Sequence, residues 1–121
     1  MMIAIPVNDD AIEAGVCVSF GRAPYFAIYN DENEAYTFLK NPAADSAGGA
    51  GIKAAQFVAD TGVCAVLTPR CGENSAEVLK AAGINIYKSV NEDIAQAVRE
   101  FAAGELRVLT SFHAGFHGHG G

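Results

Sequence analysis

The sequence has no apolar run that approaches the roughly 18 residues needed to span a membrane. The opening segment, Met1–Val7, also lacks the basic start and long apolar stretch of a signal peptide, so we expect a cytoplasmic protein with no membrane partner. Half of the 121 residues are apolar, which excludes a disordered chain and is enough for one domain with its own core.

Basic residues are also few. Lys and Arg total 8 against 14 Asp and Glu, which gives a formal net charge of −6 at pH 7, and the basic residues do not cluster. Because the phosphates of nucleic acids require a basic face, we expect no nucleic-acid partner.

Cysteine is scarce, and Cys17, Cys64 and Cys71 are odd in number and far apart in the sequence. This pattern favours reduced thiols in a cytosol over a disulfide framework. Cys64 lies in an apolar segment that we interpret as a buried strand, which predicts a structural role for it.

The apolar periodicity predicts an α/β protein with the element order β-β-β-α-β-α-β-α. The expected strands are residues 3–7, 25–29, 35–40, 63–67 and 84–87. The expected helices are residues 51–60, 73–82 and 91–103, the last with Asn91 as its N-cap. A hairpin followed by βαβ units indicates a single domain, residues 1–103, with a mixed five-stranded sheet. Residues 104–121 are then a flexible Gly/His-rich C-terminal tail.

Three connections should meet at one edge of this sheet. Residues 8–24, 41–51 and 68–72 lie at the carboxyl ends of parallel strands, where open α/β sheets usually bind ligands. We call this the carboxyl edge.

Cys17 and Cys71 both fall in these connections. They are either small apolar residues near loops or ligands for a soft metal or an iron–sulfur species. Cys71 follows Arg70 and precedes a helix, and both features favour its thiolate form.

Arg22 and a glycine-rich segment offer possible anion contacts. Arg22 either pairs with Asp9 or Asp10 or binds an anionic ligand through its guanidinium. Gly49 and Gly51 open a helix, where free N–H groups can hold an anion or glycine can simply provide a flexible backbone. No Gly-Lys-Ser/Thr follows, so the segment is not a Walker loop.

All three histidines, His113, His117 and His119, lie in the expected tail. Gly/His segments bind divalent metals through neutral imidazole, which makes these residues candidate ligands. The alternative is a terminus without a binding role. An extended tail is long enough to reach the carboxyl edge.

Several segments resemble those of a known family, in the same order along nearly the whole chain. Phe20-Gly21-Arg22-Ala23, which leads into an aromatic strand, is similar to the hallmark of the dinitrogenase iron–molybdenum cofactor biosynthesis family. Further similar landmarks are Ile3–Val7, Asn41-Pro42, Gly49-Ala50-Gly51, Gly62-Val63, Gly83–Tyr87 and Gly104-Glu105-Leu106.

The resemblance implies a ribonuclease H-like fold and a cargo of iron–sulfur or iron–molybdenum clusters. It implies a cluster-binding or carrier protein rather than an enzyme, with metallocluster donor or acceptor proteins as partners, in a family that includes proteins of nitrogen fixation. The family often has His immediately before Phe-Gly-Arg-Ala, where this chain has Ser19, and Cys17 or Cys71 could supply the replacement ligand.

Two other functions remain open at this point. The first is a metal-dependent hydrolase, which requires several carboxylates around divalent ions, whereas Asp9 and Asp10 have no evident partner on the other expected strands. The second is a protein–protein adaptor whose cluster site is lost.

Overall fold

A computed structural model describes residues 1–90 and 92–113 of the chain. The strands are β1 (Met2–Val7), β2 (Tyr25–Asn30), β3 (Ala35–Lys40), β4 (Ala65–Thr68) and β5 (Asn85–Lys88). The helices are η1 (Ile12–Ala14, a 3-10 turn), α1 (Ala50–Asp60), α2 (Glu73–Ala81) and α3 (Ile94–Ala102). None of the helices in the described ranges is long and apolar enough to cross a membrane.

The five strands form one mixed sheet in the order β3-β2-β1-β4-β5. β1 pairs antiparallel with β2, and β2 pairs antiparallel with β3, whereas β1–β4 and β4–β5 are parallel. The predicted fold class, a single α/β domain with a mixed five-stranded sheet, is confirmed.

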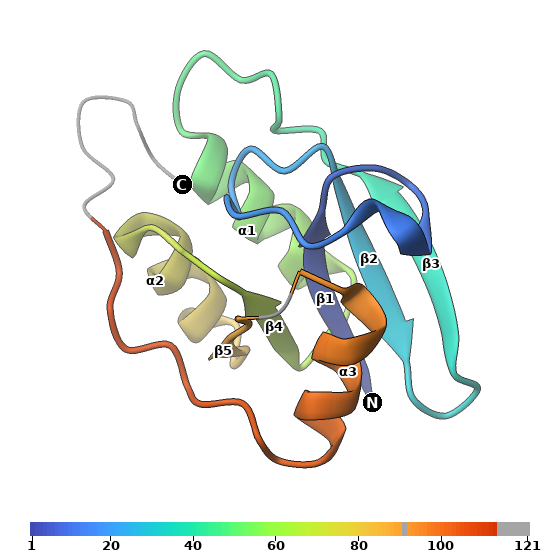
Figure 1. Cartoon of the computed structure of the whole chain (residues 1–121). Coiled ribbons are helices and arrows are strands. Elements are labelled where there is room, and N and C mark those ends of the chain that lie inside the picture. Colours follow the sequence, from blue (N-terminus) through green and yellow to red (C-terminus); the bar gives the residue numbers. More distant parts are fainter. Residues whose placement is uncertain (91, 114–121) are drawn as a thin grey trace.

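Two apolar cores lie on opposite faces of the sheet because successive strand residues point to opposite sides. Ala4 of β1 belongs to the core beneath α1 and α2, whereas Ile3 and Ile5 belong to the core beneath α3. Figure 1 shows α1 and α2 together on one face and α3 alone on the other.

Two local expectations were wrong. Cys64 is exposed rather than buried, because it lies at the edge of the sheet just before the first residue of β4. The N-cap of α3 is Asp93, not Asn91: the Asp93 carboxylate accepts hydrogen bonds from the backbone N–H groups of Ala95 and Gln96, at 2.9 and 3.3 Å.

Residues 105–113 differ from the flexible tail that we expected, and we call them the C-terminal strap. The backbone N–H of Lys88 donates to the carbonyl of Arg107 at 2.8 Å, and that of Leu109 donates to Ile86 at 2.9 Å. Leu109 is buried in the core beneath α1 and α2. Figure 1 shows the strap running past β5 toward α2. Non-local backbone pairing, which local composition does not reveal, holds this segment in place.

Candidate functional site

The carboxyl edge is assembled as the strand directions predicted. β1 and β4 are neighbouring parallel strands, so the connections that follow them, residues 8–24 and 69–72, leave the sheet at the same edge. Residues 41–49 connect β3 to α1 and lie beside residues 8–24 at the top of Figure 1.

The family-like segment is anchored through its aromatic residue. Phe20 is fully buried, and its ring packs against Phe26 with 5.1 Å between the ring centroids. Gly21 and Ala23 are also buried, whereas the Arg22 side chain between them is exposed. Phe20 therefore fixes the backbone that presents Ser19 and Arg22 at the carboxyl edge.

Arg22 does not make the predicted ion pair. Its Nη1 donates to the carbonyl oxygens of Ala44 and Ser46, at 3.3 and 2.9 Å, so the guanidinium joins residues 19–24 to residues 41–49. Asp9 and Asp10 are exposed, and Asp9 instead accepts the backbone N–H of Asp10. The predicted contact between Arg22 and an anionic ligand is untested.

Asn41 is a site residue that we did not single out. Its Nδ2 donates to the carbonyl oxygens of Gly21 and Ala23, at 3.0 and 2.9 Å, and its Oδ1 accepts from the backbone N–H of Ala43 at 3.0 Å. The side chain is buried, with 2% of its surface exposed. An Asn directly after a strand is a signal for such a clamp, but its partners are non-local.

The helix-opening glycines have different environments. Gly49 is the N-cap of α1 and has φ +68°, a left-handed conformation that glycine adopts without steric cost. A Cβ at Gly49 would meet no atom within 4 Å, so backbone conformation rather than close approach explains this glycine. Gly51 is buried in the first turn of α1. Anion binding at these N–H groups stays a prediction.

Cys17 is the more accessible of the two candidate thiols. Its side chain is partly exposed, and its backbone N–H donates to the carbonyl of Pro6 at 2.8 Å, which fixes the residue beside the end of β1. Nearby, Ser19 uses its Oγ to accept the backbone N–H of Arg22 at 3.4 Å. Ser19 therefore supports the loop that carries Arg22.

Cys71 is fully buried, which contradicts the expected thiolate. Burial raises the pKa of its thiol to about 12, with only a partial opposing effect from the charge of Lys80. The loss of solvation thus outweighs the helix N-terminus and Arg70. The Sγ donates to the carbonyl of Gly72, with 3.6 Å between the two atoms.

His113 pairs through its backbone with the two residues that follow Cys71 in the sequence. Its carbonyl oxygen accepts the backbone N–H of Glu73 at 2.9 Å, and it forms a bridge with Gly72. His117 and His119 lie outside the described residues. In the part of the chain that is described, no three His, Cys, Asp or Glu side chains gather into a metal-binding group.

Comparisons with known proteins identify the family. The family model for the dinitrogenase iron–molybdenum cofactor matches residues 1–104. A curated relative, an uncharacterized protein from Methanocaldococcus jannaschii, is 28% identical over 109 residues, which cover 88% of this chain and 89% of the relative.

Two solved structures are similar to this chain in both fold and sequence. The apo form of the orange protein from Desulfovibrio gigas is 28% identical with a TM-score of 0.86, and the match covers 91% of this chain and 93% of that chain. A Thermotoga protein provisionally named as a NifB protein is 33% identical with a TM-score of 0.80, over 92% of this chain and 95% of that one. The chain therefore belongs to the dinitrogenase iron–molybdenum cofactor family.

Proposed function

We propose that this protein binds an iron–sulfur or iron–molybdenum cluster as cargo at the carboxyl edge and passes it between donor and acceptor proteins without turnover. The observation that carries the proposal is the family match over residues 1–104, which links the chain to biosynthesis of the iron–molybdenum cofactor. The similar orange protein is described as an apo form, the term for a protein without its bound group.

Cys17 is the first ligand in this proposal. A partly exposed, unpaired thiol lies on a loop whose backbone is fixed by hydrogen bonds, three residues before the buried anchor Phe20. Thiolate sulfur is a preferred ligand for iron in clusters. A fixed backbone also lowers the entropic cost of holding the thiol at the cargo.

Cys71 is the second ligand, and it requires a change in the loop that carries it. Because the resting thiol is buried and protonated, binding must move residues 69–72 and remove a proton. Arg22 lies at the same edge, where its positive charge favours an anionic cargo.

Anaerobic reconstitution with ferrous iron and sulfide tests this proposal. The full chain should become brown and show sulfur-to-iron charge-transfer absorption, and Cys17→Ser should remove most of it. Cys64→Ser is a matched control, because Cys64 is also an unpaired thiol but is exposed at the opposite edge of the sheet.

The outcomes distinguish Cys17, the proposed ligand, from Cys64, the control. Full colour in Cys17→Ser together with loss in Cys64→Ser would place the ligand at the wrong edge. A colourless wild-type product that retains no iron after gel filtration would contradict cluster binding altogether. Transfer of the colour to an apo-ferredoxin, followed by its absorption spectrum, tests the carrier role.

A further inference from the structure

A cavity of about 500 Å³ opens at the edge of the sheet opposite the carboxyl edge. We call this the amino edge, because β1 begins there. Aromatic and aliphatic side chains supply the apolar lining: Ile3, Tyr29, Tyr87, Val98, Phe101 and Leu106. The volume lies within the range of roughly 300–1,000 Å³ that is usual for small-molecule sites, and such sites also have a mostly apolar lining.

The aromatic part of the lining comes from three separate elements. Tyr29 belongs to β2, Tyr87 to β5 and Phe101 to α3. The Tyr87 and Phe101 rings meet edge to face, with 5.2 Å between their centroids, and Phe101 packs on the core beneath α3. The aromatic walls are therefore held by two strands and a helix rather than by a loop.

The polar part of the lining favours positive charge. Asp31 lines the cavity with a carboxylate, and Ala102 and Gly104 place the C-terminal end of α3 there. A helix C-terminus carries a partial negative charge, and the faces of aromatic rings are also electronegative. These three features all attract a cation.

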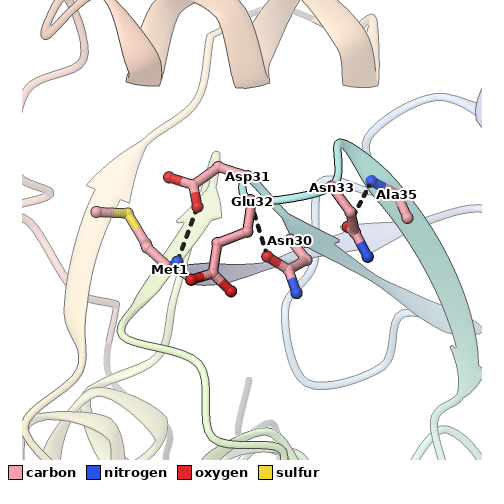
Figure 2. Close-up of polar contacts among 6 residues, drawn as sticks. All are labelled: Met1, Asn30, Asp31, Glu32, Asn33 and Ala35. Atoms are coloured by element: carbon pink, nitrogen blue, oxygen red, sulfur yellow. Dashed lines mark hydrogen bonds and ion pairs between the residues drawn. The ribbon is translucent and has the colours of Figure 1, made fainter.

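The ammonium group of Met1 already lies beside Asp31 in this cavity. The Met1 amino group donates to Asp31 Oδ1 at 2.8 Å, and the side chains of these two residues are about half exposed, at 49% and 51%. Figure 2 shows the pair next to the turn that follows β2, with one contact drawn to the Asp31 carboxylate. The Asp31 hydrogen bond raises the pKa of this amino group, and the charges of Asp31 and Glu32 add to the effect.

The second oxygen of Asp31 can serve another cation. Among the described residues, Oδ2 has no hydrogen-bond partner, and an ionised carboxylate accepts several donors. Met1 thus shows that an ammonium fits against Asp31 without using all of its acceptor capacity.

We propose that this cavity binds a small organic cation, a molecule with an aromatic body and a primary ammonium group. The body packs against Tyr29, Tyr87 and Phe101, and the ammonium donates to Asp31 Oδ2. The site is separate from the cluster site at the carboxyl edge, so its failure would leave the proposed function intact.

Titration of the full, untagged chain with 2-phenylethylammonium, followed by NMR, tests the proposal. Two probes with the same ring and a different head group, 2-phenylethanol and 3-phenylpropanoate, serve as controls. We expect the ammonium to bind about three- to tenfold more tightly than the alcohol, since an exposed ion pair and a cation–π contact each add a modest stabilisation. The shifted signals should belong to Val98, Phe101 and Leu106.

Charge-matched variants identify the carboxylate. Asp31→Asn should bring the ratio of the two affinities close to one, whereas Asp45→Asn, which removes the same charge from an exposed residue in residues 41–49, should leave it unchanged. Equal binding of all three probes, an equal effect of the two variants, or shifts confined to other parts of the chain would each overturn the proposal.

Discussion

Asn41 joins the two loops that form most of the carboxyl edge. Its buried amide serves two carbonyl groups of residues 21–23 and one N–H group of its own loop. Arg22 makes a second connection between the same two loops from the exposed side. The position of Cys17 and Arg22 relative to residues 41–49 therefore depends on these polar contacts as well as on the apolar core that Phe20 and Ala43 share.

Replacing Asn41 should destabilise the protein. Asn41→Ala leaves buried carbonyl groups of Gly21 and Ala23 without a donor, which should lower the free energy of unfolding by about 1–3 kcal/mol. Asn33→Ala is the control, because Asn33 also accepts a backbone N–H but lies in the exposed turn after β2. Urea unfolding measures both, and equal losses would show that Asn41 is not a buried clamp.

The Cys71 thiol should reduce stability at alkaline pH. Burial raises its pKa from the ordinary 9.0 to about 12, so the folded state favours the protonated thiol more than the unfolded state does. Its contribution to stability is therefore fully present below about pH 9 and is lost as the pH rises toward 12. The free energy of unfolding, measured over this range under reducing conditions, should fall less steeply in Cys71→Ala.

Cys64→Ala is the control for this pH dependence, because the Cys64 thiol is exposed. It should show the same slope as the wild type. A Cys71→Ala variant with an unchanged slope would mean that the thiol is not held protonated by burial.

At the scale of elements, the C-terminal strap joins β5 to the start of α2. Its backbone pairs with Ile86 and Lys88 at one end and with Glu73 at the other. Lys80 of α2 lies over the Phe112 ring of the strap, with 4.3 Å from Nζ to the ring centroid. Because Cys71 lies immediately before α2, the strap restricts the loop that must move if Cys71 is to become a ligand.

Loosening the strap should expose Cys71. Leu109→Ala removes a buried side chain and should lower the free energy of unfolding by about 2–4 kcal/mol. Alkylation of Cys71, followed by mass spectrometry, should be faster than in the wild type. Val108→Ala is the neighbouring control, since Val108 is 57% exposed and should change neither quantity.

Faster labelling could also result from a lower global stability. Val98→Ala separates the two causes, because Val98 lies in the core on the other face of the sheet. The rates of Cys71 alkylation in Leu109→Ala and Val98→Ala are compared at equal free energy of unfolding. An equal increase in both variants would contradict a local role of the strap.

At the scale of the whole molecule, one sheet supports two cores. The core beneath α1 and α2 contains Val58, and the core beneath α3 contains Val98. Since β1 contributes to both, loss of either core removes the support for the other. The two edges of the same sheet carry the two proposed sites.

The two cores should therefore unfold together. Val58→Ala and Val98→Ala should each lower the free energy of unfolding by about 1–3 kcal/mol without splitting the transition. Circular dichroism reports on the helices of both faces, whereas tyrosine fluorescence reports mainly on the face of α3, where Tyr29, Tyr36 and Tyr87 pack. Separate midpoints for the two signals in either variant would show that the cores unfold independently.

The fold could be predicted closely because its signals are local. Apolar runs such as Ile3–Val7 identified the strands, and the direction of each strand follows from the lengths of the connections. The boundary of α3 was missed by a few residues, because Asn91 and Asp93 are both good N-cap residues and only the backbone decides between them.

The candidate site was less predictable. The convergence of the loops at the carboxyl edge followed from strand direction, but the environment of each side chain did not. Arg22 was expected either to pair with Asp9 or Asp10 or to bind an anionic ligand, and in the structure it donates to the carbonyl groups of a loop more than 20 residues away in the sequence. The aromatic cavity at the amino edge has no motif, since its lining comes from several elements that are distant in the sequence.

The sequence by itself determined the α/β fold, the edge at which the loops meet and the family to which the chain belongs, because periodicity and the order of landmarks are properties of the chain alone. Tertiary structure decided which thiol is accessible: Cys17 is partly exposed, whereas Cys71 is buried with a raised pKa. The physical reason is that solvation and hydrogen-bond partners depend on residues brought together from distant parts of the chain, and no local pattern encodes them.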